Sequence, residues 1–191
     1  DHAVRNPAKW GWRNQLEQRE ISGRNLLIIG YGRAGQKLAQ MAAGFDMNIC
    51  AYDPYLQAQG WPKGAVKPID TLADALAWAD CLSLHVPRGD KPLLGADAFA
   101  QMKPGMIIAN TARGGVICET ALAAALSDGT VHAAGLDVFD VEPPTGNMAV
   151  DHHDNAILSP HIAGLTVESN VRVSQSISDK ILDFLISGRK K

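Results

Sequence analysis

The sequence has few cysteines, no excess of positive charge and no long hydrophobic run. Its 191 residues include Cys50, Cys81 and Cys118, an odd number without CxxC spacing, which argues against a disulfide framework and a zinc site. Lysine and arginine total 18 against 20 acidic residues, so the net charge of −2 argues against a nucleic-acid or anionic-membrane partner. No apolar run approaches the ~18 residues of a membrane helix. We therefore expect a cytoplasmic protein whose thiols stay reduced.

The sequence also has few clusters of residues that could bind a metal ion. The stretch Asp151–Asp154 reads Asp-His-His-Asp and has the residue types that bind metals. Adjacent side chains in an exposed loop rarely converge on one ion, however. We therefore expect a solvated loop there and no metal site.

Short apolar runs alternate with helical patterns along most of the chain. This alternation predicts an α/β protein with a Rossmann-type, doubly wound parallel sheet in a three-layer α/β/α arrangement. The predicted strands cover residues 25–29, 48–52, 81–84, 106–109, 132–138 and 155–158. The predicted helices begin near residues 33, 72, 96, 120 and 166.

Three segments are expected. Residues 1–21 are polar with isolated tryptophans and suit a short helix or an extended arm. Residues 22–165 hold the alternating pattern and form the domain. Residues 166–191 form a helix whose apolar stripe has no following strand to cover, so the stripe needs another partner.

A glycine motif follows the first predicted strand and opens the first helix. Gly30, Gly32 and Gly35 give the pattern GxGxxG in the strand–turn–helix context that dinucleotide binding requires. Gly30 permits a tight turn, Gly32 lets a pyrophosphate approach the backbone, and Gly35 allows close packing of helix on strand. The helix N-terminus offers free N–H groups and a positive dipole end to the phosphates.

An acidic residue is expected about 20 positions later, at the end of the second strand. Asp53 lies there, 18 residues after Gly35. A carboxylate at this point accepts hydrogen bonds from ribose hydroxyls and repels a 2′-phosphate, which favours NAD over NADP. The alternative is an ordinary glycine-rich turn followed by a turn-forming Asp-Pro pair.

Polar residues also follow the later strands, at the edge where open α/β sheets bind ligands. Arg113 is followed by two glycines, which suggests a backbone that passes close to a ligand, and its guanidinium could clamp a carboxylate. Glu142 and His161 could form a pair in which the carboxylate orients the imidazole and favours its protonated form. The alternative is that each residue alone is a solvated or structural side chain.

Taken together, these motifs resemble the D-isomer-specific 2-hydroxyacid dehydrogenases, a family that includes D-3-phosphoglycerate dehydrogenase. The resemblance runs from about Trp10 to Asn170. The matching segments are Leu27–Gly35, Tyr52–Pro54, Asn110–Gly115, Gly135–Phe139, Val141–Pro144 and Ser159–Gly164.

The resemblance implies hydride transfer between NAD and C2 of a small 2-hydroxy or 2-oxo acid. It implies that His161 is the general acid/base, that Glu142 holds it, and that Arg113 binds the substrate carboxylate. Asp137 would contact the nicotinamide carboxamide. The cofactor groove would be lined by Gly30, Gly32, Arg33, Ala34, Gly35, Asp53, His85, Val86, Thr111, Ala112, Arg113, Asp137, His161 and Gly164.

The sequence departs from the family pattern in two places. The segment Arg88–Pro92 is about two residues shorter than the usual loop and lacks its threonines. Nothing corresponds to the substrate domain of about a hundred residues with which family members begin, and the chain has no initiator methionine. We therefore expect the cofactor-binding portion of a longer enzyme, which alone binds NAD and catalyses slowly.

The family resemblance also implies a homodimer. Arg5, Trp10, Trp12 and Arg13 match the arm through which family members pair. An alternative function is an NAD-sensing interaction protein of the corepressor type, which shares the fold and the triad. A formate dehydrogenase relative is disfavoured because those proteins carry glutamine where Glu142 stands.

Overall fold

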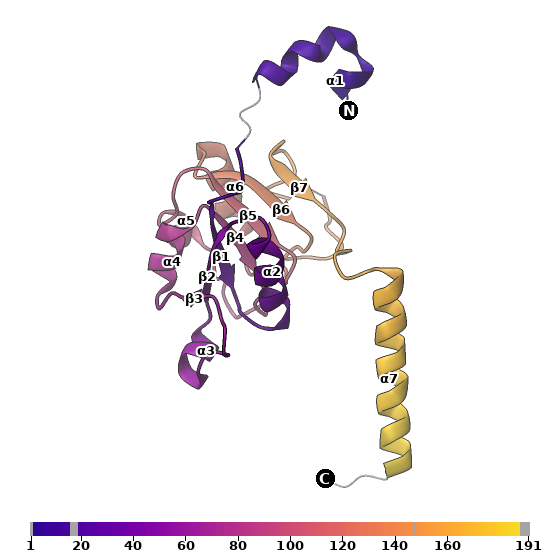
Figure 1. The fold of residues 1–191 in the computed structure, drawn as a ribbon. Helices are drawn as coiled ribbons and strands as arrows, with labels where there is room; N and C mark the ends of the chain where they lie inside the picture. The colour runs from indigo at the N-terminus through magenta and orange to yellow at the C-terminus, as the bar shows by residue number, and fades with distance from the viewer. Residues whose placement is uncertain (1, 16–18, 147, 188–191) are drawn as a thin grey trace.

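The computed structural model describes residues 2–15, 19–146 and 148–187, and a parallel sheet of seven strands lies at the centre of this part (Figure 1). The strands are β1 (Asn25–Ile29), β2 (Asn48–Tyr52), β3 (Lys67–Pro68), β4 (Cys81–Leu84), β5 (Met106–Asn110), β6 (Val131–Leu136) and β7 (Ala156–Leu158). Their order across the sheet is β3-β2-β1-β4-β5-β6-β7. The predicted doubly wound α/β fold is confirmed.

Helices connect the first six strands in succession and also lie in both end segments. They are α1 (His2–Arg5), the 3-10 helix η1 (Pro7–Gln15), α2 (Arg33–Ala43), α3 (Pro54–Gln59), α4 (Leu72–Trp78), α5 (Ala96–Phe99), α6 (Glu119–Asp128) and α7 (Val167–Ser187). The helix predicted from residue 72 begins where expected, because the Thr71 hydroxyl accepts the backbone N–H of Asp74 at 3.1 Å.

Strand β1 shows why the central strands read as continuous apolar runs. Leu27 and Ile29 pack into the core beneath α4, α5 and α6, whereas Leu26 and Ile28 pack into a second core beneath α2. Successive side chains of a strand point to opposite faces, so a strand that is covered on both faces needs apolar residues throughout.

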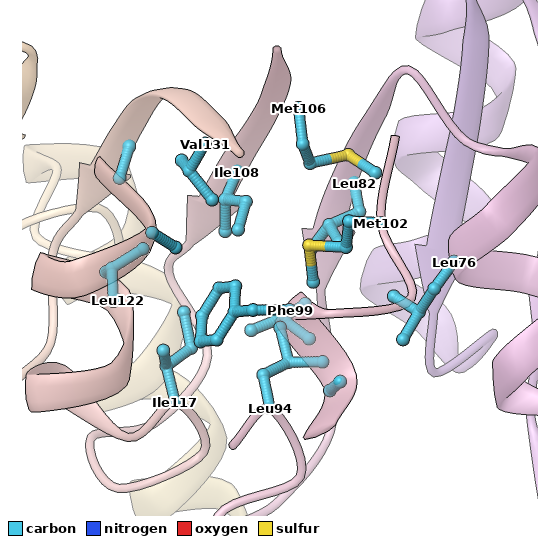
Figure 2. Close-up of a cluster of buried hydrophobic side chains, with 14 of the residues drawn as sticks. Leu76, Leu82, Leu94, Phe99, Met102, Met106, Ile108, Ile117, Leu122 and Val131 are labelled. Carbon is cyan, nitrogen blue, oxygen red and sulfur yellow. The ribbon is translucent and has the colours of Figure 1, made fainter. Parts of the chain in front are cut away.

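The larger core joins the middle of the sheet to three helices. Figure 2 shows Phe99 of α5 at its centre, with side chains from α4, α6 and the strands around it. Leu76 and Leu122 of the flanking helices and Ile108 of β5 are almost completely buried. This packing fixes the strands whose carboxyl ends carry the polar residues.

Two elements were not anticipated from the sequence. Residues 54–68 lie outside the predicted strands and helices, but they contain α3 and the two-residue edge strand β3. The signal for α3 was the Asp53–Pro54 pair, because aspartate is a favoured N-cap and proline a favoured first helical residue. Strand β6 also ends at Leu136, two residues before its predicted end.

Both end segments project from the body of the sheet (Figure 1). Trp10 in η1 is half exposed, and the side chains of Trp12 and Arg13 lie outside the described part. Helix α7 buries none of its residues against the part of the chain described, so its apolar stripe is open. No helix among the described residues is both long and apolar enough to cross a membrane.

The three cysteines are free thiols. Cys50 is buried, whereas Cys81 is only partly buried. Burial raises the pKa of Cys81 to about 11, so this thiol stays protonated at neutral pH.

Candidate functional site

The glycine loop lies between the carboxyl end of β1 and the start of α2. Gly30 has φ +92°, and a Cβ there would lie 2.6 Å from the carbonyl oxygen of His85. A Cβ on Gly35 would lie 2.3 Å from the carbonyl oxygen of Gly30, so α2 packs closely on the loop. Nothing lies within 4 Å of a Cβ built on Gly32, the N-cap of α2. The loop therefore has the tight turn, the close packing and the open backbone that a pyrophosphate needs.

Asp53 ties the glycine loop to the second strand. One carboxylate oxygen accepts the Tyr31 N–H at 2.8 Å, and the other accepts the N–H groups of Tyr55 and Leu56 at 3.0 and 3.1 Å. The residue thus caps α3 and anchors the loop as well. A carboxylate has about four acceptor positions, so it can still accept from a ribose hydroxyl.

An apolar cavity of about 400 Å³ opens beside this loop. It is lined by Ile29 of β1, Tyr52 of β2 and Val86, which follows β4. His85, beside Val86, contacts the Ser83 hydroxyl at 3.0 Å, and burial lowers its pKa. The topology reverses between β1 and β4, and this is the place where doubly wound sheets bind nucleotides. The residues present therefore fit the adenosine half of a dinucleotide.

Asn110 shapes the loop that carries Thr111, Ala112 and Arg113. Its side-chain oxygen accepts the Ala112 N–H and its side-chain nitrogen donates to the Arg113 carbonyl, both at 3.1 Å. Asn110 is buried, whereas Thr111 and Arg113 are exposed. This positioning role was missed from the sequence, where Asn110 was only part of a motif.

Gly114 brings this loop against the segment after β6. A Cβ there would lie 1.6 Å from the carbonyl oxygen of Phe139, so only glycine fits this backbone contact. The contact places Arg113 near the segment that carries Glu142. A small cavity of about 220 Å³ is lined by Arg113, Glu142 and His161 together. The structure thus brings the three predicted catalytic residues to one site.

Glu142 and His161 form a direct pair. The His161 Nδ1 lies 2.7 Å from Glu142 Oε2, and Glu142 Oε1 accepts the Phe139 N–H at 2.9 Å. These hydrogen bonds, led by that from His161, lower the pKa of Glu142, so it is a carboxylate across the neutral range. With Nδ1 donating to Glu142, Nε2 is the nitrogen left for a ligand.

The backbone at His161 is held in an unusual conformation. Its φ is +54°, a left-handed value that non-glycine residues adopt rarely and often at functional sites. Asp137 supports this turn, since its carboxylate accepts the Ser159 hydroxyl at 2.5 Å and the N–H groups of Ile162 and Ala163 at 2.9 and 2.8 Å. Burial alone would raise the pKa of Asp137, but these hydrogen bonds outweigh it and lower the pKa.

Asp137 therefore lies beneath the histidine turn, with its carboxylate engaged by three internal donors. Its contact with a nicotinamide carboxamide stays a prediction. Gly164, three residues beyond His161, is exposed, and nothing lies within 4 Å of a Cβ built there. Arg33 and Ala34 open α2, which follows β1, a strand in the middle of the sheet, whereas His161 follows the edge strand β7. Within the described ranges, no group of three or more histidine, cysteine or acidic residues could hold a metal ion.

The sheet edge thus carries two halves of one extended site, and comparisons with known proteins point the same way. A family model described as "D-isomer specific 2-hydroxyacid dehydrogenase, NAD binding domain" matches residues 1–163. The (S)-sulfolactate dehydrogenase of Chromohalobacter salexigens is 40% identical over 171 residues, which cover 88% of this chain and 55% of that protein. The hydroxypyruvate reductase of Thermotoga maritima is 41% identical over 181 residues, 93% of this chain and 58% of that protein.

Further relatives include D-3-phosphoglycerate dehydrogenases at 36% to 39% identity. Among solved structures, the D-mandelate dehydrogenase of Rhodotorula graminis superposes with a TM-score of 0.85 at 30% identity, covering 98% of this chain and 57% of that one. The chain spans between 31% and 58% of the length of the curated relatives named here.

Proposed function

The chain belongs to the D-isomer specific 2-hydroxyacid dehydrogenase family and matches the NAD-binding domain of that family, so we propose that it is the cofactor-binding domain of an NAD-dependent D-2-hydroxyacid dehydrogenase. The reaction is hydride transfer between nicotinamide and C2 of a D-2-hydroxy acid or 2-oxo acid. The observation that carries this proposal is the His161–Glu142 pair, which shares a cavity with Arg113.

The residues of the site divide the work of reducing a 2-oxo acid. Arg113 binds the carboxylate through its guanidinium and polarises the neighbouring carbonyl. His161 donates the proton on Nε2 to the carbonyl oxygen, while Glu142 holds Nδ1–H and stabilises the imidazolium. The nicotinamide ring supplies the hydride for C2 when the cofactor is bound. In the reverse direction, His161 takes the hydroxyl proton.

The cofactor we propose is NAD rather than NADP. The Asp53 carboxylate lies at the end of β2, where it would meet the adenine ribose. A 2′-phosphate would bring a second negative charge to this carboxylate, and like charges at short distance repel. Gly32 at the start of α2 supports a dinucleotide of either kind, because its open backbone leaves room for the pyrophosphate that NAD and NADP share.

We further propose that a substrate-binding domain completes the site in the whole enzyme. The open apolar stripe of α7 would pack on that domain, and residues 1–21 would form the arm of a homodimer. Substrate candidates are the three-carbon acids named for relatives, with sulfonate, hydroxyl or phosphate at C3. The chain alone should bind the cofactor and turn over slowly.

Arg113→Gln tests the proposal in the whole enzyme. We expect kcat/KM for 2-oxo acids to fall about 100-fold, because a charge-assisted, two-pronged contact with the carboxylate is lost. The measurement is the rate of NADH oxidation with glyoxylate, hydroxypyruvate, sulfopyruvate and phosphohydroxypyruvate. The matched control is Arg24→Gln, an exposed arginine at the amino end of β1, which should leave the rate unchanged. Equal loss in both variants, or none in either, contradicts the assignment of Arg113.

A further inference from the structure

Arg88 lies in the shortened segment after β4 and holds a residue on the other side of the site. Its Nη2 forms an ion pair with Asp140 Oδ1 at 2.6 Å, and its Nη1 donates to the Asp140 carbonyl oxygen at 3.2 Å. One guanidinium therefore fixes both the side chain and the backbone of Asp140. The contact needs glycine at Gly115, where a Cβ would lie 2.7 Å from the Arg88 Cζ.

A second residue holds Asp140 from another direction. Glu119, in the first turn of α6, accepts the Asp140 N–H on its Oε1 at 2.9 Å. The backbone N–H, the backbone carbonyl and the carboxylate of Asp140 are thus all engaged. The two holding residues come from segments 31 positions apart in the sequence, so the turn after β6 is fixed by tertiary contacts.

A short path of contacts leads from Asp140 to the histidine. Phe139, the residue before Asp140, is buried and donates its N–H to Glu142 Oε1 at 2.9 Å. The other oxygen of Glu142 contacts His161 Nδ1 at 2.7 Å. We propose that Arg88 is a positioning residue, which holds Asp140 and thereby keeps Glu142 aligned with His161.

The exposure of the Arg88–Asp140 pair separates this role from simple stabilisation. The two side chains are 54% and 53% exposed, and ion pairs at such sites contribute only about 0–1 kcal/mol to stability. Loss of Arg88 should therefore leave the fold intact. What changes is the mobility of the turn after β6, because two nitrogens of the Arg88 guanidinium bind Asp140 in that turn.

The tautomer of His161 can be measured without any ligand, and it tests the positioning role of Arg88. A carboxylate that accepts from Nδ1–H fixes the neutral imidazole in the Nδ1–H form, whereas an unconstrained imidazole prefers Nε2–H. Removing the charge of Arg88 does not by itself favour either tautomer of His161. Misalignment of Glu142 does, because it takes away the acceptor that holds Nδ1–H. Nitrogen-15 NMR of the histidine-labelled 191-residue chain above neutral pH distinguishes the two forms, and His161→Gln assigns the signal.

We expect the Nδ1–H signature in the wild type and its loss in Arg88→Ala, as in the positive control Glu142→Ala. Arg88→Lys keeps the charge but offers a single point of contact, so it should retain only part of the signature. Asp140→Asn removes the ion pair without deleting the residue and should act in the same direction. Thermal melting should show equal stability for the wild type and Arg88→Ala.

An unchanged tautomer in Arg88→Ala, with a clear change in Glu142→Ala, would overturn the proposal. If Arg88→Ala fails to fold, the same comparison is made with Asp140→Asn. The inference rests on the proposed role of His161, but the measurement needs neither cofactor nor substrate. The two proposals can therefore fail separately. If Arg88→Ala changes the tautomer but the whole enzyme reduces no 2-oxo acid, the proposed function is refuted and the positioning role of Arg88 is retained.

Discussion

Replacing His161 with glutamine should lower kcat for 2-oxo acid reduction in the whole enzyme by about 10²–10⁴-fold, the usual contribution of a positioned general acid. Glutamine has a similar reach and can still accept or donate a hydrogen bond, but it cannot release a proton to the carbonyl oxygen. Binding of NADH should change little, because the glycine loop and Asp53 follow β1 and β2, whereas His161 follows β7 at the edge of the sheet. Initial rates and a separate NADH titration measure the two effects.

His152→Gln is the matched control for this variant. His152 is a loop histidine whose side chain is 85% exposed and whose partner is the adjacent Asp151. It should keep full activity. Glu142→Gln should have an intermediate effect, since it removes the charge beside the imidazolium and keeps the acid itself. Near-normal kcat in His161→Gln would show that the proton comes from elsewhere.

Gly114→Ala should cost about 2–4 kcal/mol of the free energy of unfolding. The new Cβ would stand 1.6 Å from the Phe139 carbonyl oxygen, which is backbone and cannot rotate away. Relief requires the loop after β5 to separate from the turn after β6. That movement would also draw Arg113 away from Glu142 and His161. Urea denaturation of the chain measures the change.

Gly95→Ala serves as the control for Gly114→Ala. Gly95 precedes α5 with φ −99°, and nothing lies within 4 Å of a Cβ built there. Gly95 is the N-cap of α5, and because alanine is a poorer N-cap than glycine, its substitution should cost at most about 1 kcal/mol of the free energy of unfolding. A Gly114→Ala chain as stable as the Gly95→Ala chain would mean that the two loops do not make this close contact.

Local patterns were sufficient to predict six of the seven strands and the glycine loop. Strand β1 is a continuous apolar run because both its faces are buried, and this is visible in the sequence. The turn at Gly30 and the packing at Gly35 depend on glycines at fixed spacing, which the motif displays directly. Topology then follows, because parallel strands require crossovers of one hand.

Contacts between distant residues could not be predicted in this way. Arg88 and Asp140 are 52 positions apart, and each reads in the sequence as an ordinary loop charge. The use of Asp137 beneath the histidine turn likewise depends on backbone N–H groups that face it only after folding. The sequence predicts Asp53 as a ribose ligand, and its three internal hydrogen bonds show that it is a structural anchor.

The most direct test of the account is a titration of the 191-residue chain with NADH and, separately, with NADPH. Energy transfer from tryptophan to the reduced nicotinamide reports binding. One donor is Trp61, whose ring is tilted against Tyr31 of the glycine loop, with the two ring centroids 5.8 Å apart. We expect micromolar NADH binding and much weaker NADPH binding, with the difference reduced in Asp53→Asn. Failure of both nucleotides to bind would contradict the claim that this sheet edge is a dinucleotide site.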